Sequence, residues 1–307
     1  MAQANAVTVV GEKLAEKIAR DLSRARPSKF SVRYIPIINR TFPDSEVQPR
    51  LGGEVKTSVV ILAIDKLERE TINDYLVRFY LITANIRPQV KKIIAVMPYF
   101  PYARQDKAFR RGEPLSFELI ANIISSNVDE FVTVNPHEHR LLMKNVFKVP
   151  VRVVSAFPIL GVEFSKADLV VGPDSESAPF VQEFVGQTKL ATLVFNKVRN
   201  VATGEVKFTL PKGVQVKTVV KGKDIVLVDD VIASGRTILQ LKKELTKEGA
   251  HSISLAFVHD MTNAETSRKL IAAGFKKIST TDTLPSRFKK VSVADSIVDF
   301  LKEYLTN

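Results

Sequence analysis

The chain has 307 residues, no cysteine and a formal net charge of +12, with 45 Lys and Arg against 33 Asp and Glu. The absence of cysteine excludes disulfides and thiol chemistry, and a content of 45% hydrophobic and 25% charged residues is typical of an ordered globular protein. The longest apolar run, Val59 to Ile64, is far below the roughly 20 residues of a membrane helix, and the first residues lack a signal-peptide pattern, so we expect a cytoplasmic protein.

Short apolar strands alternate with amphipathic helices along the whole chain, which predicts an α/β fold with mainly parallel sheets flanked by helices. The expected strands are 7–10, 59–64, 93–97, 131–134, 169–171, 190–195, 225–228 and 253–258. The expected helices are 14–22, 116–125, 237–249 and 293–305. Because so many strands exceed one sheet, we expect two domains, 1–150 and 151–307, with the last helix able to fold back onto the first domain.

A stiff, polar loop follows the strand 93–97. Two prolines and three aromatic residues lie between Met97 and Lys107, and Arg104, Gln105 and Lys107 then offer a guanidinium, an amide and an ammonium group together. Such a set suits a nucleotide, since arginine can stack on a base or hold phosphates while glutamine can bind a base edge. A solvated basic surface loop is the alternative.

Three further segments follow expected strands and bear polar side chains. His137 lies in the segment 135–139, and no cysteine or acidic triad accompanies it to complete a zinc site. The carboxylate of Asp174 can hold hydrated magnesium or cap the next helix. Lys197 and Arg199 are two residues apart and so lie on one side of an extended segment, as cations on many surface loops do.

The segment Asp224 to Thr237 is the most informative part of the chain. Its apolar stretch Ile225 to Val228 predicts a buried parallel strand, and Asp229 and Asp230 follow it at the carboxyl end, where open α/β sheets bind ligands. Three small residues, Ala233 to Gly235, allow backbone N–H groups to surround a phosphate at the start of a helix near Thr237. The carboxylates remain available to ribose hydroxyls. The alternative interpretation is an ordinary strand-end turn.

This segment resembles the phosphoribosyl-binding signature of phosphoribosyltransferases and ribose-phosphate pyrophosphokinases. Two other segments are similar to the second family alone. The loop 98–107, followed by Gly112-Glu-Pro-Leu-Ser116, looks like its ATP-binding segment, and Phe42-Pro-Asp-Ser-Glu46 looks like its adenine-contacting loop. The resemblance extends over nearly the whole chain, so the chain is identified as a member of the ribose-phosphate pyrophosphokinase family.

The resemblance implies two phosphoribosyltransferase-like domains, ATP and ribose 5-phosphate as substrates, Mg²⁺ as cofactor, and 5-phosphoribosyl 1-diphosphate and AMP as products. It also implies a homo-oligomer in which a neighbouring subunit supplies the adenine loop. Binding of two polyanionic substrates would account for the positive charge, so we expect neither nucleic acid nor a membrane as a partner. By this resemblance Lys197 is catalytic with Arg199 beside it, and His137 and Asp174 contact the metal. The residues implied for ATP are Phe42, Asp44, Ser45, Glu46, Arg104 and Gln105. Those implied for ribose 5-phosphate are Arg199, Asp229, Asp230, Ala233, Ser234, Gly235, Arg236 and Thr237.

The sequence departs from the family pattern at two positions. Ala233 and Asn135 stand where many members carry Asp. A phosphate site built from backbone amides does not need the first carboxylate, whereas the second departure affects the details of metal binding. Two alternative functions remain: a nucleobase phosphoribosyltransferase, or a non-catalytic regulatory homologue that binds a nucleotide or a partner enzyme.

Overall fold

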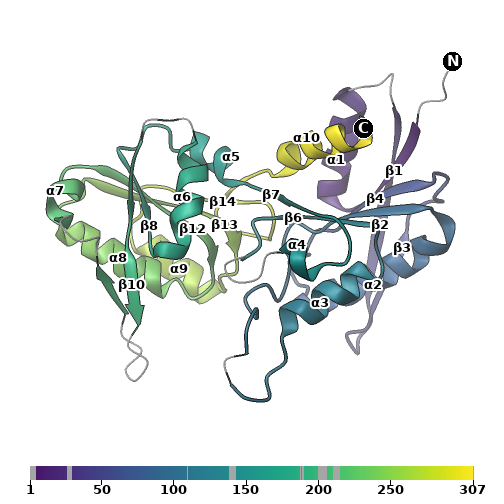
Figure 1. Ribbon diagram of the computed structural model, residues 1–307, viewed down its shortest axis with the longest axis horizontal. Coiled ribbons are helices and arrows are strands. Elements are labelled where there is room, and N and C mark those ends of the chain that lie inside the picture. Colours follow the sequence, from purple (N-terminus) through teal and green to yellow (C-terminus); the bar gives the residue numbers. More distant parts are fainter. Residues whose placement is uncertain are drawn as a thin grey trace. The chain divides into compact units, whose positions relative to one another are not determined.

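The computed structural model describes residues 5–25, 30–108, 110–137, 143–186, 188, 190–199, 206–209 and 215–306. The chain divides into two compact units (Figure 1). The first unit comprises residues 1–154 and 293–307, and the second comprises residues 155–292. Each contains a mainly parallel sheet with helices packed against it, so the predicted α/β fold class is confirmed.

The first unit has a seven-stranded sheet in the order β3-β2-β1-β4-β5-β6-β7. Its strands are β1 (Asn5–Gly11), β2 (Phe30–Thr41), β3 (Val47–Leu51), β4 (Val59–Ala63), β5 (Lys92–Val96), β6 (Glu130–Val134) and β7 (Val151–Val154). All neighbours pair in parallel except β2 and β3, which form an antiparallel hairpin. Strands β4 to β6 are almost continuously buried, as expected for parallel strands covered on both faces.

The helices of the first unit cover both faces of this sheet. They are α1 (Lys13–Ala25), α2 (Ile72–Ile86), α3 (Ser116–Ser125), α4 (Met143–Val146) and α10 (Ala294–Thr306), with the short 3₁₀ helix η1 (Arg87–Gln89). Helices α2 and α3 share one hydrophobic core with β4 and β5, and α1 packs with α10 on the other side, as Figure 1 shows. A capping box starts α2, because the Asp74 N–H donates to Thr71 Oγ1 and the Thr71 N–H to Asp74 Oδ2.

Helix α10 completes the first unit from the far end of the chain. Ile297, Val298 and Leu301 are buried, and the side chain of Tyr304 is hydrogen-bonded to Lys92 of β5. The Arg152 guanidinium lies 5.1 Å from the centre of the Phe300 ring. The last helix therefore packs against the unit that contains the start of the chain.

The second unit has a six-stranded, fully parallel sheet in the order β15-β14-β13-β12-β8-β9 and a separate antiparallel pair, β10 and β11. Its strands are β8 (Leu169–Gly172), β9 (Ala191–Val194), β10 (Asn196–Arg199), β11 (Val206–Thr209), β12 (Asp224–Ile232), β13 (Ser252–Asp260), β14 (Ile278–Thr281) and β15 (Lys289–Val291). Its helices are α5 (Phe157–Val162), α6 (Ala178–Val185), α7 (Val216–Val220), α8 (Arg236–Lys247) and α9 (Ala264–Ala272), with the 3₁₀ helix η2 (Ser175–Ser177). Helices α8 and α9 pack on the core around β12 and β13.

Both sheets have a point at which the direction of winding reverses. In the first unit the chain passes from β1 to β2 on one side, and β4 lies on the other. In the second unit it passes from β8 to β9 on one side, and β12 lies on the other. Open α/β sheets bind ligands at the carboxyl ends of the strands beside such a switch point. Ligand binding is therefore expected at the carboxyl ends of β1 and β4 in the first unit and of β8 and β12 in the second.

Two elements differ from the expectations. The hairpin β2–β3 was not among the expected strands, because its residues alternate with polar ones and include Pro36 and Pro49. Strand β12 runs to Ile232, four residues beyond the predicted end at Val228, because its partner β13 continues to Asp260 and extends the ladder. Asp229 and Asp230 thus lie within the strand. Within the described residues, none of the helices combines the length and apolar character needed to cross a membrane.

Candidate active site

Three carboxylates gather at the switch point of the second unit. Asp229 and Asp230 lie in β12, and Asp174 lies just beyond the end of β8. The side chain of Asp230 is almost fully buried, with 3% exposure, and its backbone N–H donates to Asp229 Oδ1 at 3.0 Å. The structure thus brings the predicted Asp174, Asp229 and Asp230 together at one edge of one sheet.

The electrostatics of this cluster are unfavourable in the absence of a cation or hydrogen-bond donor. Burial raises the pKa of Asp229 well above its usual value, and the charges of Asp230 and Asp174 raise it further. Negative charge is thus concentrated where it is poorly solvated. A strongly raised pKa in a group of converging acids is typical of a binding or catalytic site. Hydroxyl donors or a cation would relieve the repulsion.

The loop after β12 has the backbone geometry that a phosphate site needs. Gly235 has a φ of +66°, in the left-handed region that glycine adopts without strain, and α8 begins at the next residue. Gly235 also packs on α9, since an added Cβ would lie 3.3 Å from a methyl carbon of Thr266. Ser234 and Arg236 are exposed, so the N-terminus of α8 is accessible to an anion.

A second tight turn holds Asp174 beside this loop. Gly172 ends β8, and an added Cβ there would lie only 2.1 Å from the Ser177 hydroxyl oxygen. The Ser177 N–H and hydroxyl both donate to the Asp174 carbonyl. Glycine is therefore required for the chain to turn from β8 into η2 and place Asp174 at the carboxyl edge.

Lys197 and Arg199 lie on β10, and their backbones pair with Phe208 and Val206 of β11. Their side chains, and residues 200–205, lie outside the described residues. The roles assigned to these two cations thus stay predictions.

A pocket lies at the opposite, amino-terminal edge of the second sheet. Its volume is about 580 Å³, and Glu163, Asp224 and Lys276 are among its lining residues. The charges here are paired within the protein: Lys276 Nζ lies 3.1 Å from Asp224 Oδ2, and Lys277 Nζ lies 2.7 Å from Glu163 Oε2. We prefer the carboxyl edge as the active site, because its acidic groups repel one another and the sheet topology favours ligands there.

In the first unit, the loop with Arg104 and Gln105 is held by aromatic packing and one strained residue. Phe100 makes edge-to-face contacts with Phe117 and Phe131 in the core. Tyr102 has a φ of +63°, and its hydroxyl donates to Asn73 Oδ1 at 2.6 Å. Arg104 and Gln105 follow and are both exposed, as a ligand-contacting pair would be. A non-glycine residue in the left-handed region is typical of a functional site.

The predicted adenine loop is the tip of the β2–β3 hairpin. The Phe42 ring is partly exposed and lies 4.4 Å from the Arg40 guanidinium carbon, while Asp44 and Glu46 are exposed. Ser45 adopts a φ of +76° at the turn. The hairpin borders a pocket of about 300 Å³.

His137 follows β6 at the same edge of the first sheet. Asn135, two residues earlier, is buried with a φ of +35°. Residues 138–142 lie outside the described residues. His137 belongs to the first unit and Asp174 to the second, so neither unit alone contains both predicted metal contacts. Across the described parts of the chain, no group of three or more His, Cys, Asp or Glu side chains is arranged to hold a metal ion.

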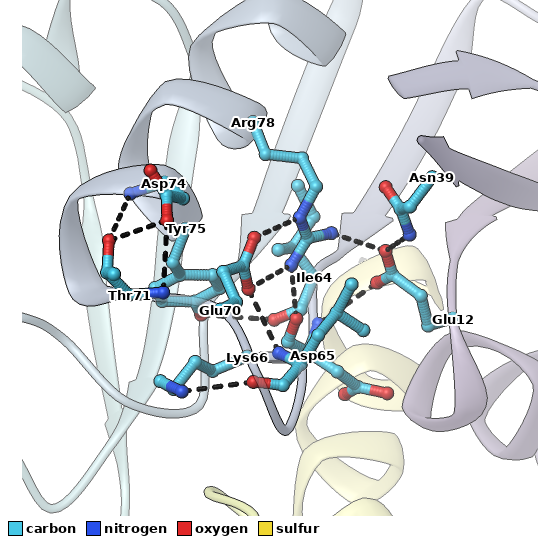
Figure 2. Close-up of polar contacts among 11 residues, drawn as sticks. Glu12, Asn39, Ile64, Asp65, Lys66, Glu70, Thr71, Asp74, Tyr75 and Arg78 are labelled. Carbon is cyan, nitrogen blue, oxygen red and sulfur yellow. Dashed lines mark hydrogen bonds and ion pairs between the residues drawn. The ribbon is translucent and has the colours of Figure 1, made fainter. Parts of the chain in front are cut away.

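A buried ion network that was not predicted from the sequence lies at the switch point of the first unit (Figure 2). Arg78 of α2 has 1% exposure and binds Glu70 through two hydrogen bonds, Nε to Oε1 at 2.6 Å and Nη2 to Oε2 at 2.9 Å. It also donates to Glu12, just after β1, and to the carbonyl of Asp65, just after β4. A charged residue on the apolar face of α2, between Tyr75 and Phe79, was the available signal.

Burial and pairing act in opposite directions in this network. Burial raises the pKa of Glu12, although the Arg78 charge opposes the shift. Burial also lowers the pKa of Arg78, but the Glu70 hydrogen bond and the Glu12 charge outweigh it and the net shift is upward. Because a guanidinium does not lose its proton near neutral pH, we treat the network as ionic.

Comparisons with known proteins agree with the motifs. Residues 7–127 match the family described as the N-terminal domain of ribose phosphate pyrophosphokinase, and residues 162–294 match the phosphoribosyl transferase domain. A ribose-phosphate pyrophosphokinase from Methanopyrus kandleri is 32% identical over 301 residues, covering 95% of this chain and 96% of the relative. One from Methanothermobacter thermautotrophicus is 32% identical over 272 residues, covering 87% and 92%.

A solved structure shows the same fold. The crystal structure of phosphoribosylpyrophosphate synthetase from Mycobacterium smegmatis matches with a TM-score of 0.80 over 99% of both chains, at 23% identity. The sequence relatives extend over nearly the whole length and carry the same family name. The resemblance predicted from the motifs is thus confirmed, and this chain belongs to the ribose-phosphate pyrophosphokinase family of enzymes.

Proposed function

We propose that this chain transfers the β,γ-diphosphoryl group of ATP to the 1-hydroxyl of ribose 5-phosphate, giving 5-phosphoribosyl 1-diphosphate and AMP. One observation carries the proposal: in a chain of this family, Asp174, Asp229 and Asp230 converge at the switch point beside the loop that ends at Gly235. In this reaction the sugar hydroxyl oxygen bonds to the β-phosphorus while the bond from that phosphorus to the bridging oxygen breaks. The bridging oxygen leaves with AMP, and the hydroxyl proton is released.

We assign ribose 5-phosphate to the second unit. The carboxylates of Asp229 and Asp230 would accept hydrogen bonds from the ribose hydroxyls, which would offset the burial and the repulsion that raise the pKa of Asp229. The 5-phosphate would lie against the backbone N–H groups of the loop and the N-terminus of α8, where the helix dipole favours an anion. The residues of this phosphate loop are Ala233, Ser234, Gly235, Arg236 and Thr237.

We assign ATP to the first unit. Arg104 and Gln105 are exposed beyond the strained Tyr102 and can contact base and phosphates. Phe42, Asp44, Ser45 and Glu46 at the hairpin tip would contact the adenine of a neighbouring subunit, so we propose a homo-oligomer. Two exposed apolar side chains, Val77 and Leu81, lie one turn apart on α2 and support an association between subunits.

Mg²⁺ is the proposed cofactor, and the residues present fit it. The carboxylates at β8 and β12 are oxygen donors, which Mg²⁺ prefers, and Mg²⁺ needs few protein ligands because it retains waters and binds substrate phosphates. We assign Asp174 in the second unit and His137 in the first as its contacts. When bound, the cation would neutralise negative charge on the phosphates.

Alignment of substrates and stabilisation of charge are the protein's main contributions to phosphoryl-type transfer. We propose that Lys197 contacts the reacting phosphate oxygens and Arg199 holds the ribose 5-phosphate side. Both are on β10, which follows β9 of the sheet that carries the acidic cluster. A lysine or arginine aimed at charge that grows in the transition state lowers the barrier without covalent chemistry.

Incubation with ATP, ribose 5-phosphate and MgCl₂ tests the proposal, with AMP and 5-phosphoribosyl 1-diphosphate as the measured products. We expect both products in equal amounts and neither after addition of EDTA. A nucleobase phosphoribosyltransferase would instead consume 5-phosphoribosyl 1-diphosphate in the presence of a purine or pyrimidine. A regulatory homologue would bind ATP without releasing AMP. Either result would overturn the proposal.

A further inference from the structure

The hairpin that carries the proposed adenine contacts projects beyond the body of its sheet. Strand β2 pairs with β1 only as far as Pro36, opposite Gly11. The following residues, Ile37 to Thr41, pair only with β3, which is an edge strand. A two-stranded projection has little rigidity of its own. The position of its tip therefore depends on side-chain contacts near its base.

One such contact leads to the buried network. The side-chain amide of Asn39, within the projecting part of β2, donates to Glu12 Oε1 at 3.0 Å. The same oxygen accepts the hydrogen bond from Arg78, while Glu12 Oε2 accepts from the Asp65 N–H at 3.1 Å (Figure 2). Glu12 thus connects the hairpin to α2 and to the end of β4.

Arg78 fixes the position of Glu12. Its guanidinium is held by the paired hydrogen bonds to Glu70 and by the Asp65 carbonyl, so it has one orientation. The pocket of about 300 Å³ lies between this network and the hairpin, with Asn39, Ser45 and Arg78 among its lining residues. The pocket thus separates part of the hairpin from the network, and the Asn39–Glu12 hydrogen bond connects the two.

We propose that Arg78 is a positioning residue for ATP, acting through Glu12 and Asn39 to hold the hairpin that carries Phe42, Asp44 and Glu46. This inference rests on the proposed function, because it concerns the ATP site of that reaction. Stability alone does not account for the network, since apolar side chains of similar size often stabilise a buried position as well as an ion pair does. A bidentate guanidinium instead fixes a single geometry, which a binding loop requires.

Substitution at Asn39 tests the last link while every charged residue of the network stays in place, because Asn39 is uncharged and exposed. We expect Asn39→Ala to raise the KM for ATP roughly three- to tenfold, with kcat and the KM for ribose 5-phosphate within about twofold of wild type. Asn39→Asp has the same shape but opposes one carboxylate to another, so a larger rise is expected. Asn85→Ala, an exposed asparagine elsewhere in the same unit, is the matched control and should change neither constant.

A double-mutant cycle tests whether Arg78 acts through Asn39. Arg78→Lys keeps the charge but cannot hold Glu70 and Glu12 together in the same way. We expect it to raise the KM for ATP selectively, and we expect Asn39→Ala to add little in the Arg78→Lys background. Additive effects, equal rises in both KM values, or unchanged KM values in folded variants would overturn the proposal.

Binding of a non-hydrolysable ATP analogue separates this inference from the proposed function. If wild type releases no AMP, the proposed function is wrong, and the analogue still reports on the hairpin. Weaker analogue binding by Asn39→Ala than by wild type supports the positioning role in either case. Equal affinities, or no affinity in both proteins, contradict it.

Discussion

At the switch point of the first unit, the carboxylates of Glu12 and Glu70 bind a guanidinium that the chain itself supplies. At the corresponding point of the second unit, Asp174, Asp229 and Asp230 repel one another, and the pKa of Asp229 is raised by burial and by that repulsion. The two sheets thus place acidic residues at the same point of a similar topology. They differ in their described interactions, because a buried arginine pairs with both acids of the first site, whereas burial and neighbouring carboxylates raise the pKa of Asp229 at the second.

The difference indicates which switch point binds a ligand. In the first unit, Arg78 already pairs with Glu12 and Glu70, so this network needs no added cation and instead holds the surrounding elements in place. At the second site, burial and neighbouring charge disfavour the ionised form of Asp229, so this carboxyl gains most when a cation or hydrogen-bond donor binds. Substitutions at both sites test this contrast, from the largest expected effect to the smallest.

The protein should lose stability when the Arg78 guanidinium is removed from the first site. Arg78→Met leaves Glu12 and Glu70 buried without the guanidinium that pairs with both, and we expect the free energy of unfolding to fall by about 3–5 kcal/mol. Urea denaturation followed by circular dichroism measures it. The triple variant Arg78→Met, Glu12→Gln, Glu70→Gln removes the unpaired charges and should recover most of the loss. A loss below about 1 kcal/mol in Arg78→Met would show that the network is not needed to neutralise these acids.

The rate of the proposed reaction should depend on the positive charge of Lys197. We expect Lys197→Ala to lower kcat by roughly 10²- to 10³-fold, the usual cost of one donor aimed at transition-state charge. Steady-state AMP release measures kcat, and calorimetric titration should show ribose 5-phosphate binding retained. Lys217→Ala, on α7, removes an exposed lysine outside the proposed site and is the control. Wild-type turnover in Lys197→Ala would remove this lysine from the mechanism.

The charge of Asp229 should lower the stability of the ligand-free protein and strengthen the binding of ribose 5-phosphate. Asp229→Asn removes one of the repelling charges, so we expect the Tm of the ligand-free protein to rise by on the order of 2–4 °C at pH 7, as about 1 kcal/mol does in a domain of this size. We expect the Kd for ribose 5-phosphate to rise roughly tenfold, because a neutral amide accepts hydrogen bonds less strongly. Asp299→Asn, an exposed residue of α10, is the control. A lower Tm combined with unchanged binding would reverse the interpretation.

The raised pKa of Asp229 determines how the stability of the protein changes with pH. The folded protein holds a proton on Asp229 more tightly than the unfolded chain does, because the folded-state pKa is raised. The stabilisation by that proton is complete below the ordinary aspartate pKa and is lost as the pH rises through the raised value. Differential scanning calorimetry across this window should therefore show the wild-type Tm approaching that of Asp229→Asn at low pH.

The smallest effect concerns the loop with Arg104 and Gln105. Tyr102→Phe removes the hydroxyl that donates to Asn73, and we expect a two- to fivefold rise in the KM for ATP, roughly the value of one net hydrogen bond. Tyr80→Phe is a matched control, because the buried Tyr80 hydroxyl has no hydrogen-bond partner among the described residues and burial raises its pKa to about 12. That control should be neutral or slightly stabilising. Equal effects of the two substitutions would exclude a role for the Tyr102 contact.

The sequence predicted what depends on local pattern. The buried strands β4, β5 and β12 are continuous apolar runs, and small residues with a glycine precede α8, so the fold class and the position of the acidic cluster followed from these runs. The resemblance identified the family. The fold class was confirmed because its signals lie within short segments whose geometry the backbone largely determines, although Asp229 and Asp230 lie within β12 and not after it.

Non-local features were not predictable in the same way. The Arg78 network joins residues as far apart as Glu12 and Arg78, and nothing at either position alone predicts the pairing. The hairpin β2–β3 lacks a clean apolar alternation because β3 is an edge strand. The left-handed φ of Tyr102 is not indicated by residue type, since a residue other than glycine seldom adopts it. These features arise from tertiary contacts, which one sequence does not display.

The position of α10 has a consequence for biosynthesis. This helix is translated after all the other described elements, yet its buried Ile297 and Leu301 belong to the unit that contains β1. During elongation on the ribosome, residues 155–292 can therefore emerge and fold before the amino-terminal half acquires its covering helix. Until α10 emerges, the surface of α1 that packs against it stays uncovered, and apolar surface exposed in this way favours aggregation.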